Sequence, residues 1–405
     1  MAAEVADRRI WMWLLAFGLA GVPAFVFRFS GADLEPVAAA VIFGIGIVGG
    51  AFIISWAAEA AQVDVSASFA IAVLALIAIL PEYAIEAILA WDAGASYNPA
   101  LGNVTDEMQR VAANVTGSNR LLIGLGWSLV ILIFWFKHRR TLDLRGSMGL
   151  ELGMLVAATL ATLSIFFMEQ VHLVLAAVLI TMYLFYLWVT STREAEEPEL
   201  MGVSLLVGSL PTLRRRVTVV AMFAYAAAVI LAAAEPFVDS LIETGLDLGI
   251  DEFILIQWVA PLASESPEII IAILFSLRAN PVAGLTTLIS AEVNQLTLLV
   301  GSMVVIFSIS AGEALSFPLD DRQSVEFLLT TAVSAFAIIL VAPRVIGWRA
   351  GALILGLFVV HLFFTSKDER LIFTYIYLAL AAGLVAAYGL KYVRGRRARA
   401  LTAAD

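Results

Sequence analysis

The chain has 405 residues, of which 61% are hydrophobic and only 14% are charged. An ordinary soluble domain is about half apolar and a quarter charged, so this composition excludes the soluble class. Cysteine is absent, which excludes disulfide bonds and thiolate metal sites. Apolar runs of spanning length recur from residue 10 to residue 393 and predict an integral protein of the lipid bilayer.

These runs lack the apolar–polar alternation of barrel strands, so we predict an all-α fold with about twelve transmembrane helices. The predicted spans cover residues 10–29, 35–60, 66–91, 110–136, 147–168, 171–191, 217–237, 251–278, 282–310, 326–343, 348–365 and 371–393. With the N-terminus inside, the inner loops hold 18 of the 24 Lys and Arg residues and the outer loops five. This asymmetry predicts a multi-pass protein of the cell membrane with both termini cytoplasmic.

The outer connection after the seventh span is acidic, and it either concentrates cations by its field or is simply a solvated loop. Its acids are Glu235, Asp239, Glu243, Asp247, Asp251 and Glu252.

Two halves of the chain echo each other. A Pro-Glu pair lies deep in the third span, at Pro81-Glu82, and again 186 residues later in the eighth, at Pro267-Glu268. The third span runs outward and the eighth inward, so the halves are predicted to be inverted-topology repeats. Secondary transporters are often built in this way, with the substrate site at mid-membrane.

Glu82 and Glu268 are the leading candidates for a metal site. Each is predicted to lie roughly 15 Å deep at 1.5 Å per residue, near the middle of a core about 30 Å thick. A glutamate there costs about 2.5 kcal/mol or more, which makes it a functional candidate. The preceding prolines free backbone carbonyls, and carboxylates with carbonyls form the oxygen set that calcium prefers. The alternative is a kink whose glutamate pairs with a neighbour.

Further acids accompany this pair. Glu86 shares a helix face with Glu82, Glu265 shares one with Glu268, and Glu292 lies in the ninth span. A buried carboxyl group keeps its proton more readily than an exposed one, so a surplus of acids suits proton coupling. For Glu86 and Glu292, pairing inside the bundle explains their presence equally well.

Arg120 lies about ten residues into the fourth span. Because it cannot lose its proton, it should pair with a carboxylate, either as a substitute for a bound cation or as a structural clamp. Its candidate partners are Glu86, Glu265 and Glu292.

Neutral polar residues also lie in the fourth and ninth spans. Asn114, Ser118 and Asn119 offer oxygens to a cation, although small polar residues also bind spanning helices together. We find no phosphate-binding loop and no nucleophile–base pair, so we expect neither an enzyme nor a cofactor. Inorganic cations are the expected partners, with no nucleic acid, and the oligomeric state is left open.

The Pro-Glu pair, followed in the next span by Asn114-Val-Thr-Gly-Ser-Asn119, resembles the alpha-repeat of the calcium/cation antiporter superfamily, which contains sodium/calcium and calcium/proton exchangers. The resemblance implies a ten-helix exchanger core with one extra helix at each end. The implied parts are an extra helix in 1–34, a first repeat in 35–191, a cytoplasmic linker in 192–216, a second repeat in 217–365, and an extra helix with a basic tail in 366–405.

The resemblance also implies site residues. In the family, the Pro-Glu glutamate of each repeat coordinates the ion, which corresponds to Glu82 and Glu268. The family's polar residues ahead of Pro-Glu are matched by Ser264 and Ser266, with Glu265 as an added acid. The first repeat lacks these oxygens, and the second has Glu292-Val-Asn294 in place of Gly-Ser-Asn.

The sequence therefore predicts an antiporter that exchanges calcium, or another small cation, for protons or sodium. The alternatives are a sodium/proton exchanger on the same scaffold and a membrane scaffold or sensor that transports nothing. The predicted cation-binding residues are Glu82, Glu268, Glu265, Glu86, Ser264, Ser266, Asn114 and Ser118, and the predicted charge-balancing residues are Arg120, Glu292, Asn119 and Asn294.

Overall fold

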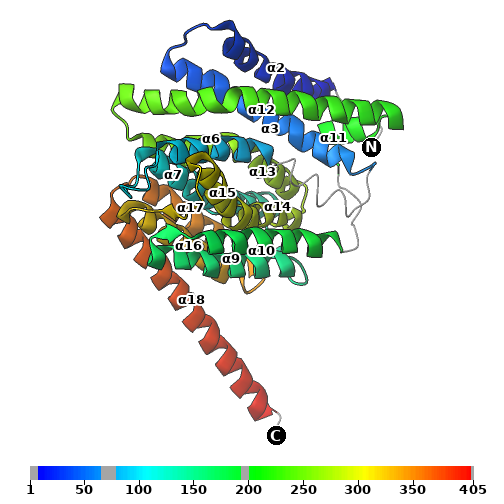
Figure 1. Cartoon of the computed structure of the whole chain (residues 1–405). Helices are drawn as coiled ribbons and strands as arrows, with labels where there is room; N and C mark the ends of the chain where they lie inside the picture. Colours follow the sequence, from blue (N-terminus) through cyan, green and yellow to red (C-terminus); the bar gives the residue numbers. More distant parts are fainter. Residues whose placement is uncertain (1–7, 65–78, 193–199, 403–405) are drawn as a thin grey trace. The chain divides into compact units, whose positions relative to one another are not determined.

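The computed structural model describes residues 8–64, 79–192 and 200–402, with side chains up to residue 390. Helices dominate the described part, which confirms the predicted all-α membrane fold (Figure 1). Ten of the described helices are long and apolar enough to cross a membrane, judged by length and composition. The apolar helix α17 is shorter, with 15 residues.

The elements follow the predicted spans in order. The helices are α2 (Arg8–Ser30), α3 (Pro36–Ala61), α6 (Leu80–Ser96), α7 (Asp106–Leu121), α8 (Ser128–His138), α9 (Gly149–Met168), α10 (Leu173–Ser191), α11 (Val203–Gly208), α12 (Thr212–Leu248), α13 (Glu252–Leu277), α14 (Pro281–Asn294), α15 (Val300–Ala311), α16 (Asp321–Val341), α17 (Trp348–Leu362) and α18 (Lys367–Thr402). Two π-helical segments are η2 (Leu122–Trp127) and η3 (Gln295–Leu299). The short strands are β1 (Leu142–Asp143), β2 (Gln170–Val171), β3 (Phe317–Pro318) and β4 (Val345–Ile346).

One predicted span is wrong, and another lies partly outside the described residues. The span predicted at 217–237 is the 37-residue helix α12, which continues through Pro236 and ends at Gly249, a residue with a positive φ of 64°. Most of the predicted acidic loop is therefore helical. The span predicted at 66–91 is described only from Leu80, because residues 65–78 lie outside the described part. Pro81 lies in the first turn of α6, where proline removes no hydrogen bond, so it does not kink that helix.

The fourth and ninth spans each contain a π-helical segment that the sequence analysis did not predict. Segment η2 begins three residues after Asn119, and η3 begins directly after Asn294. Such segments occur mostly as single turns and frequently at functional sites. A π-helical segment in the corresponding span of each half is what two copies of one repeat would produce.

The chain divides into two compact units. Unit 1 comprises Met1–Ser118, Val171–Ile270 and Thr297–Pro318, and unit 2 comprises Asn119–Gln170, Ile271–Leu296 and Leu319–Asp405. Each unit draws on both halves of the chain. The predicted domain boundaries divide the chain differently and stay a prediction.

In unit 1, helices α2, α3 and α12 lie side by side (Figure 1). The C-terminal end of α3 is also held by the segment that leads into α12. Arg215 donates to Asp64 at 2.6 and 2.9 Å and to the carbonyls of Gly208 and Leu210 at 3.1 and 3.0 Å. Hydrogen bonds from Arg215 lower the pKa of Asp64 to about 2, so this pair persists at physiological pH.

In unit 2, α16 packs against α9 and α18, and α17 packs against α8. Strands β1 and β4 pair in antiparallel fashion, with Leu142 opposite Ile346. This short pairing joins the loop after α8 to the loop before α17.

Helices α7 and α13 of unit 1 approach closely at Gly117. A Cβ atom at this position would collide with the backbone carbonyl of Gln257. Pro261 lacks the N–H that would otherwise bond to that carbonyl one turn back in α13. The missing side chain of Gly117 therefore allows α7 to lie directly against the backbone carbonyl of Gln257.

We expect Gly117→Ala to destabilise the protein by about 1–3 kcal/mol, because the added methyl group must push two packed helices apart. The matched control is Gly153→Ala in α9, where a Cβ atom meets nothing within 4 Å. Since alanine favours a helix more than glycine does, the control should be neutral or slightly stabilising. Thermal unfolding in detergent measures both variants, and equal melting temperatures would contradict the close approach.

Candidate functional site

The structure separates the predicted site residues into two groups. All eight predicted cation-binding residues belong to unit 1, and all four predicted charge-balancing residues belong to unit 2. Helix α7 carries members of both groups, because it runs from Asp106 to Leu121.

Carboxyl groups gather around Glu82 in unit 1. Glu82 lies in the first turn of α6 with only 6% of its surface exposed. Glu86, Glu265 and Glu268 lie close enough to interact with its charge, and Glu268 also interacts with Glu265. The two Pro-Glu motifs, far apart in sequence, therefore contribute to one acidic cluster, and their role as cation ligands stays a prediction.

Glu82 and Glu265 share a side-chain hydrogen bond. An ionised carboxylate can only accept hydrogen bonds, so one of the two groups must carry the proton that joins them. Glu265 is as deeply buried as Glu82, with 3% of its surface exposed. A shared proton would neutralise two such buried carboxyl groups, and a metal cation could do so in the same way.

Neutral oxygens complete the cluster. The amide nitrogen of Asn114 donates to Glu86 at 2.7 Å, and both residues are buried. Ser118 lies one turn after Asn114 on α7 and is fully buried. Its hydroxyl group forms no hydrogen bond within the described residues, so its oxygen is available to a ligand.

The two predicted serine ligands of α13 bond to their own helix. The Ser266 hydroxyl donates to the carbonyl of Ala263 at 3.2 Å. That is the carbonyl which Pro267, having no N–H, leaves without its usual partner. Ser264 donates weakly to the carbonyls of Ala260 and Pro261, at 3.4 and 3.3 Å. The oxygens of Ser264 and Ser266 retain lone pairs for a cation, but their hydroxyl protons already bond to backbone carbonyls of α13.

A fifth acid, Glu59 of α3, was not among the predicted site residues. It interacts electrostatically with Glu268 and accepts a 2.5 Å hydrogen bond from Ser204 of α11. The tripeptide Ala57-Ala-Glu59 has a counterpart that ends at Glu235 in the other half. This repeated tripeptide was the sequence signal that could have identified Glu59. Glu235 instead pairs with Arg28 near the other end of the helices.

The acidic cluster is not a rigid metal cage. Within residues 8–64, 79–192 and 200–402, no three His, Cys, Asp or Glu side chains are arranged to hold a metal ion. Carboxylates placed at metal-binding distances repel one another unless protons or a cation neutralise them. A divalent ion would therefore have to draw Glu82 and Glu268 together while displacing the shared proton.

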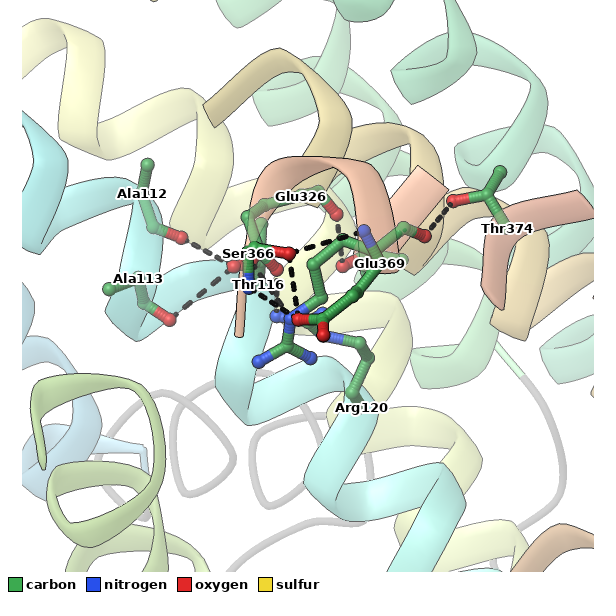
Figure 2. Close-up of polar contacts among 10 residues, drawn as sticks. Ala112, Ala113, Thr116, Arg120, Glu326, Ser366, Glu369 and Thr374 are labelled. Carbon is green, nitrogen blue, oxygen red and sulfur yellow. Dashed lines mark hydrogen bonds and ion pairs between the residues drawn. The ribbon is translucent and has the colours of Figure 1, made fainter. Parts of the chain in front are cut away.

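The charge-balancing group in unit 2 corrects the predicted partner of Arg120. Its guanidinium contacts Glu326 at 2.5 Å, with both side chains buried (Figure 2). Arg370 of α18 lies 3.4 Å from the other oxygen of Glu326. The expected partners Glu86 and Glu292 instead bond to Asn114 and Ser334. Arg120 thus pairs with a carboxylate within unit 2, but with a different acid from those expected, and its role as a cation substitute or a structural clamp stays a prediction.

The other members of this group are also buried. Ser334 of α16 donates to Glu292 at 2.9 Å, and Glu292 is fully enclosed. Asn119 and Asn294, with 0% and 2% of their surface exposed, flank the two π-helical segments.

Glu326 and Arg370 were missed because they lay at the edges of predicted spans, where charged residues are ordinary. A local signal could have placed Glu326. Asp320 and Gln323 form a capping box, which starts α16 at Asp321 rather than at residue 326. Glu326 then falls in the second turn of the helix.

Comparison with known proteins agrees with this architecture. The sequence matches the sodium/calcium exchanger protein family over residues 36–192 and 218–367. No curated protein matches the sequence. The crystal structure of the H+/Ca2+ exchanger CAX is 38% identical, with a TM-score of 0.88, and the match covers 96% of this chain and 98% of that one.

Two more distant structures share the fold alone. The Ca2+/H+ antiporter protein YfkE is 14% identical with a TM-score of 0.59, over 92% of this chain and all of its own. The sodium-calcium exchanger NCX_Mj is 15% identical with a TM-score of 0.53, over 82% of this chain and all of its own. The family match spans well over half of the sequence in two segments. The chain is a multi-pass integral membrane protein and belongs to the sodium/calcium exchanger protein family, a family of secondary cation transporters.

Proposed function

We propose that this protein exchanges calcium for protons across the membrane, with Glu82 and Glu268 as the principal cation ligands. Glu265, Glu86, Asn114 and Ser118 complete the site, and Ser264 and Ser266 add weaker oxygens. The family membership establishes cation transport by a secondary carrier. The counter-ion and the site residues are the parts that we propose.

The hydrogen bond between Glu82 and Glu265 carries the proposal. It requires a proton at the point where the two Pro-Glu segments meet. Calcium prefers several oxygen ligands, including ionised carboxylates, so its arrival must release that proton. Binding of the two ions is then mutually exclusive, which is the condition for exchange rather than co-transport.

The likeness to the exchanger CAX supports the same ion pair, because its title describes it as an H+/Ca2+ exchanger and its match covers nearly the whole chain. We further propose that both termini are cytoplasmic and that the protein resides in the cell membrane. The excess of Lys and Arg in the loops assigned to the inside supports this orientation. No cofactor beyond the transported ions is proposed.

The test is flux in vesicles that contain the purified protein. An outward proton gradient should be sufficient to drive calcium accumulation in the absence of sodium. Calcium uptake that follows only a sodium gradient would replace protons by sodium as the counter-ion. Sodium uptake without any calcium flux would favour the sodium/proton exchanger.

Glu82→Gln and Glu268→Gln should each reduce calcium flux by on the order of 100-fold, because each removes one of the two charges that face a divalent ion. The matched control is Glu243→Gln, an exposed acid on α12 that should leave the flux unchanged. Calcium-reporter dyes inside the vesicles measure the rates. Normal flux in either Pro-Glu variant would remove that glutamate from the site.

Calcium binding should weaken as the pH falls, because protons and calcium compete for the same carboxyl groups. Linkage predicts roughly a tenfold rise in the apparent Kd per pH unit for each proton released. Isothermal titration between pH 6 and 8, in buffers of different ionisation enthalpy, counts these protons directly. A Kd independent of pH would contradict proton coupling at this site.

A further inference from the structure

Basic and aromatic side chains gather in unit 2, where helix α8 ends and helix α17 begins. The segments 136–149 and 342–350 contain six Lys or Arg residues and a single acid, Asp143. Antiparallel pairing of β1 with β4 joins the two segments. The Arg344 side chain adds a second link, because it donates to the carbonyl of Ser147 at 2.7 Å. The backbone therefore holds two basic segments, about 200 residues apart in the sequence, next to each other.

Two tryptophans form the centre of this surface. The ring centroids of Trp135 on α8 and Trp348 on α17 are 5.5 Å apart. The guanidinium carbon of Arg139 lies 4.9 Å from the centroid of Trp135, and that of Arg349 lies 5.9 Å from the centroid of Trp348. Both distances allow cation–π attraction. We call the tryptophans and their basic neighbours the basic aromatic surface, which comprises Trp135, Lys137, Arg139, Arg140, Trp348 and Arg349.

The four cations of the basic aromatic surface are exposed. None of them forms an ion pair within the part of the chain that the structure describes, and Asp143 pairs with Arg145. A tryptophan ring covers a face of a guanidinium group, whereas the N–H donors of that group point outward in its plane. The donors of Arg139 and Arg349 can therefore bind an anion while both side chains stay on their rings.

The position of the surface along the helices favours a lipid. Helix α8 is the last part of an apolar segment of spanning length, Asp106–His138, and the surface begins at its end. Trp348 starts the apolar helix α17 and is 39% exposed. Tryptophan is enriched at the membrane–water interface, at the level of the lipid headgroups. An anion held there meets the surface at a high local concentration, unlike a soluble phosphate or an acidic peptide.

We propose that the basic aromatic surface binds the headgroup of an anionic phospholipid. The lipid phosphate accepts hydrogen bonds from Arg139 and Arg349, because a guanidinium group presents paired donors that match phosphate oxygens. Lys137 and Arg140 add electrostatic attraction, as basic residues next to a membrane do for anionic lipids. A zwitterionic lipid also carries a phosphate, but these cations repel its ammonium group. The inference goes beyond cation exchange and does not rest on it.

The test is thermal unfolding of the purified protein in neutral detergent micelles, with phosphatidylglycerol or phosphatidylcholine added stepwise. A ligand that binds only the folded state raises the melting temperature once its concentration exceeds its Kd. Phosphatidylglycerol should act at concentrations roughly tenfold lower than phosphatidylcholine. Equal effects of the two lipids on the wild type would overturn the proposal.

The double variant Arg139→Gln with Arg349→Gln removes both guanidinium groups, and it should weaken the effect of phosphatidylglycerol by roughly tenfold or more. The matched control is Arg145→Gln, which removes an exposed arginine of the same loop that already pairs with Asp143. This control should keep the response of the wild type. An equal loss in the control and the double variant would mean unspecific attraction and would contradict a defined site.

A second pair of variants keeps the test decisive if the first does not fold. Lys137→Gln with Arg140→Gln removes the same amount of charge from the basic aromatic surface and leaves both cation–π contacts in place. It should also weaken the effect of phosphatidylglycerol, and an unchanged response in this variant would count against the proposal.

Inorganic phosphate distinguishes a lipid site from a site for a soluble anion. It should leave the melting temperature of the wild type unchanged, because it lacks the acyl chains that keep a headgroup at this depth. Stabilisation by inorganic phosphate that disappears in the Arg139→Gln and Arg349→Gln double variant would identify a soluble anion as the ligand and overturn the lipid proposal.

Discussion

Buried carboxyl groups that lie close together can remain so only if something neutralises them, and the acidic cluster of unit 1 depends on this constraint. Burial disfavours each charge, and every neighbouring carboxylate disfavours it further. A proton shared between Glu82 and Glu265 is one solution, and a divalent cation would be another. The proposed exchange would then follow from the electrostatics of the cluster.

The buried acids of this protein differ in what neutralises them. Glu82, Glu86 and Glu265 face one another or a neutral amide, so in the proposed exchange their protons would leave when a cation arrives. Glu326 faces two arginines, which remain charged, so it is a fixed part of the structure. Glu292 belongs to the first kind, because its bond to Ser334 involves a neutral hydroxyl group. The partner of a buried acid, and not its depth, therefore distinguishes an acid suited to binding a transported ion from one that holds helices together.

Features determined by local sequence were predictable. The length and polarity of the apolar runs predicted the helices of the described residues. The Pro-Glu segments predicted an acidic site, and the structure brings Glu82 and Glu268 close enough to interact, while their role as ligands stays a prediction. Features that depend on tertiary contacts were not. The partner of Arg120 is about 200 residues away in the sequence, and Arg370 lies a further 44 residues on. The π-helical segments have no local signature, and Pro236 was interpreted as a boundary although α12 continues through it.

Helix α7 shows why motif residues cannot be interpreted as ligands alone. Within seven positions, Asn114 bonds to a site glutamate, Gly117 lets α7 contact the carbonyl of Gln257, and Arg120 pairs with Glu326. Positions 114 and 118 share a face at a spacing of four, whereas 117 and 120 share another at a spacing of three. The face with Asn114 and Ser118 therefore carries proposed cation ligands, whereas the face with Gly117 and Arg120 makes the contacts that hold the helix in place. Loss of transport after a substitution in this motif has two possible causes, and a stability measurement on the same variant separates them.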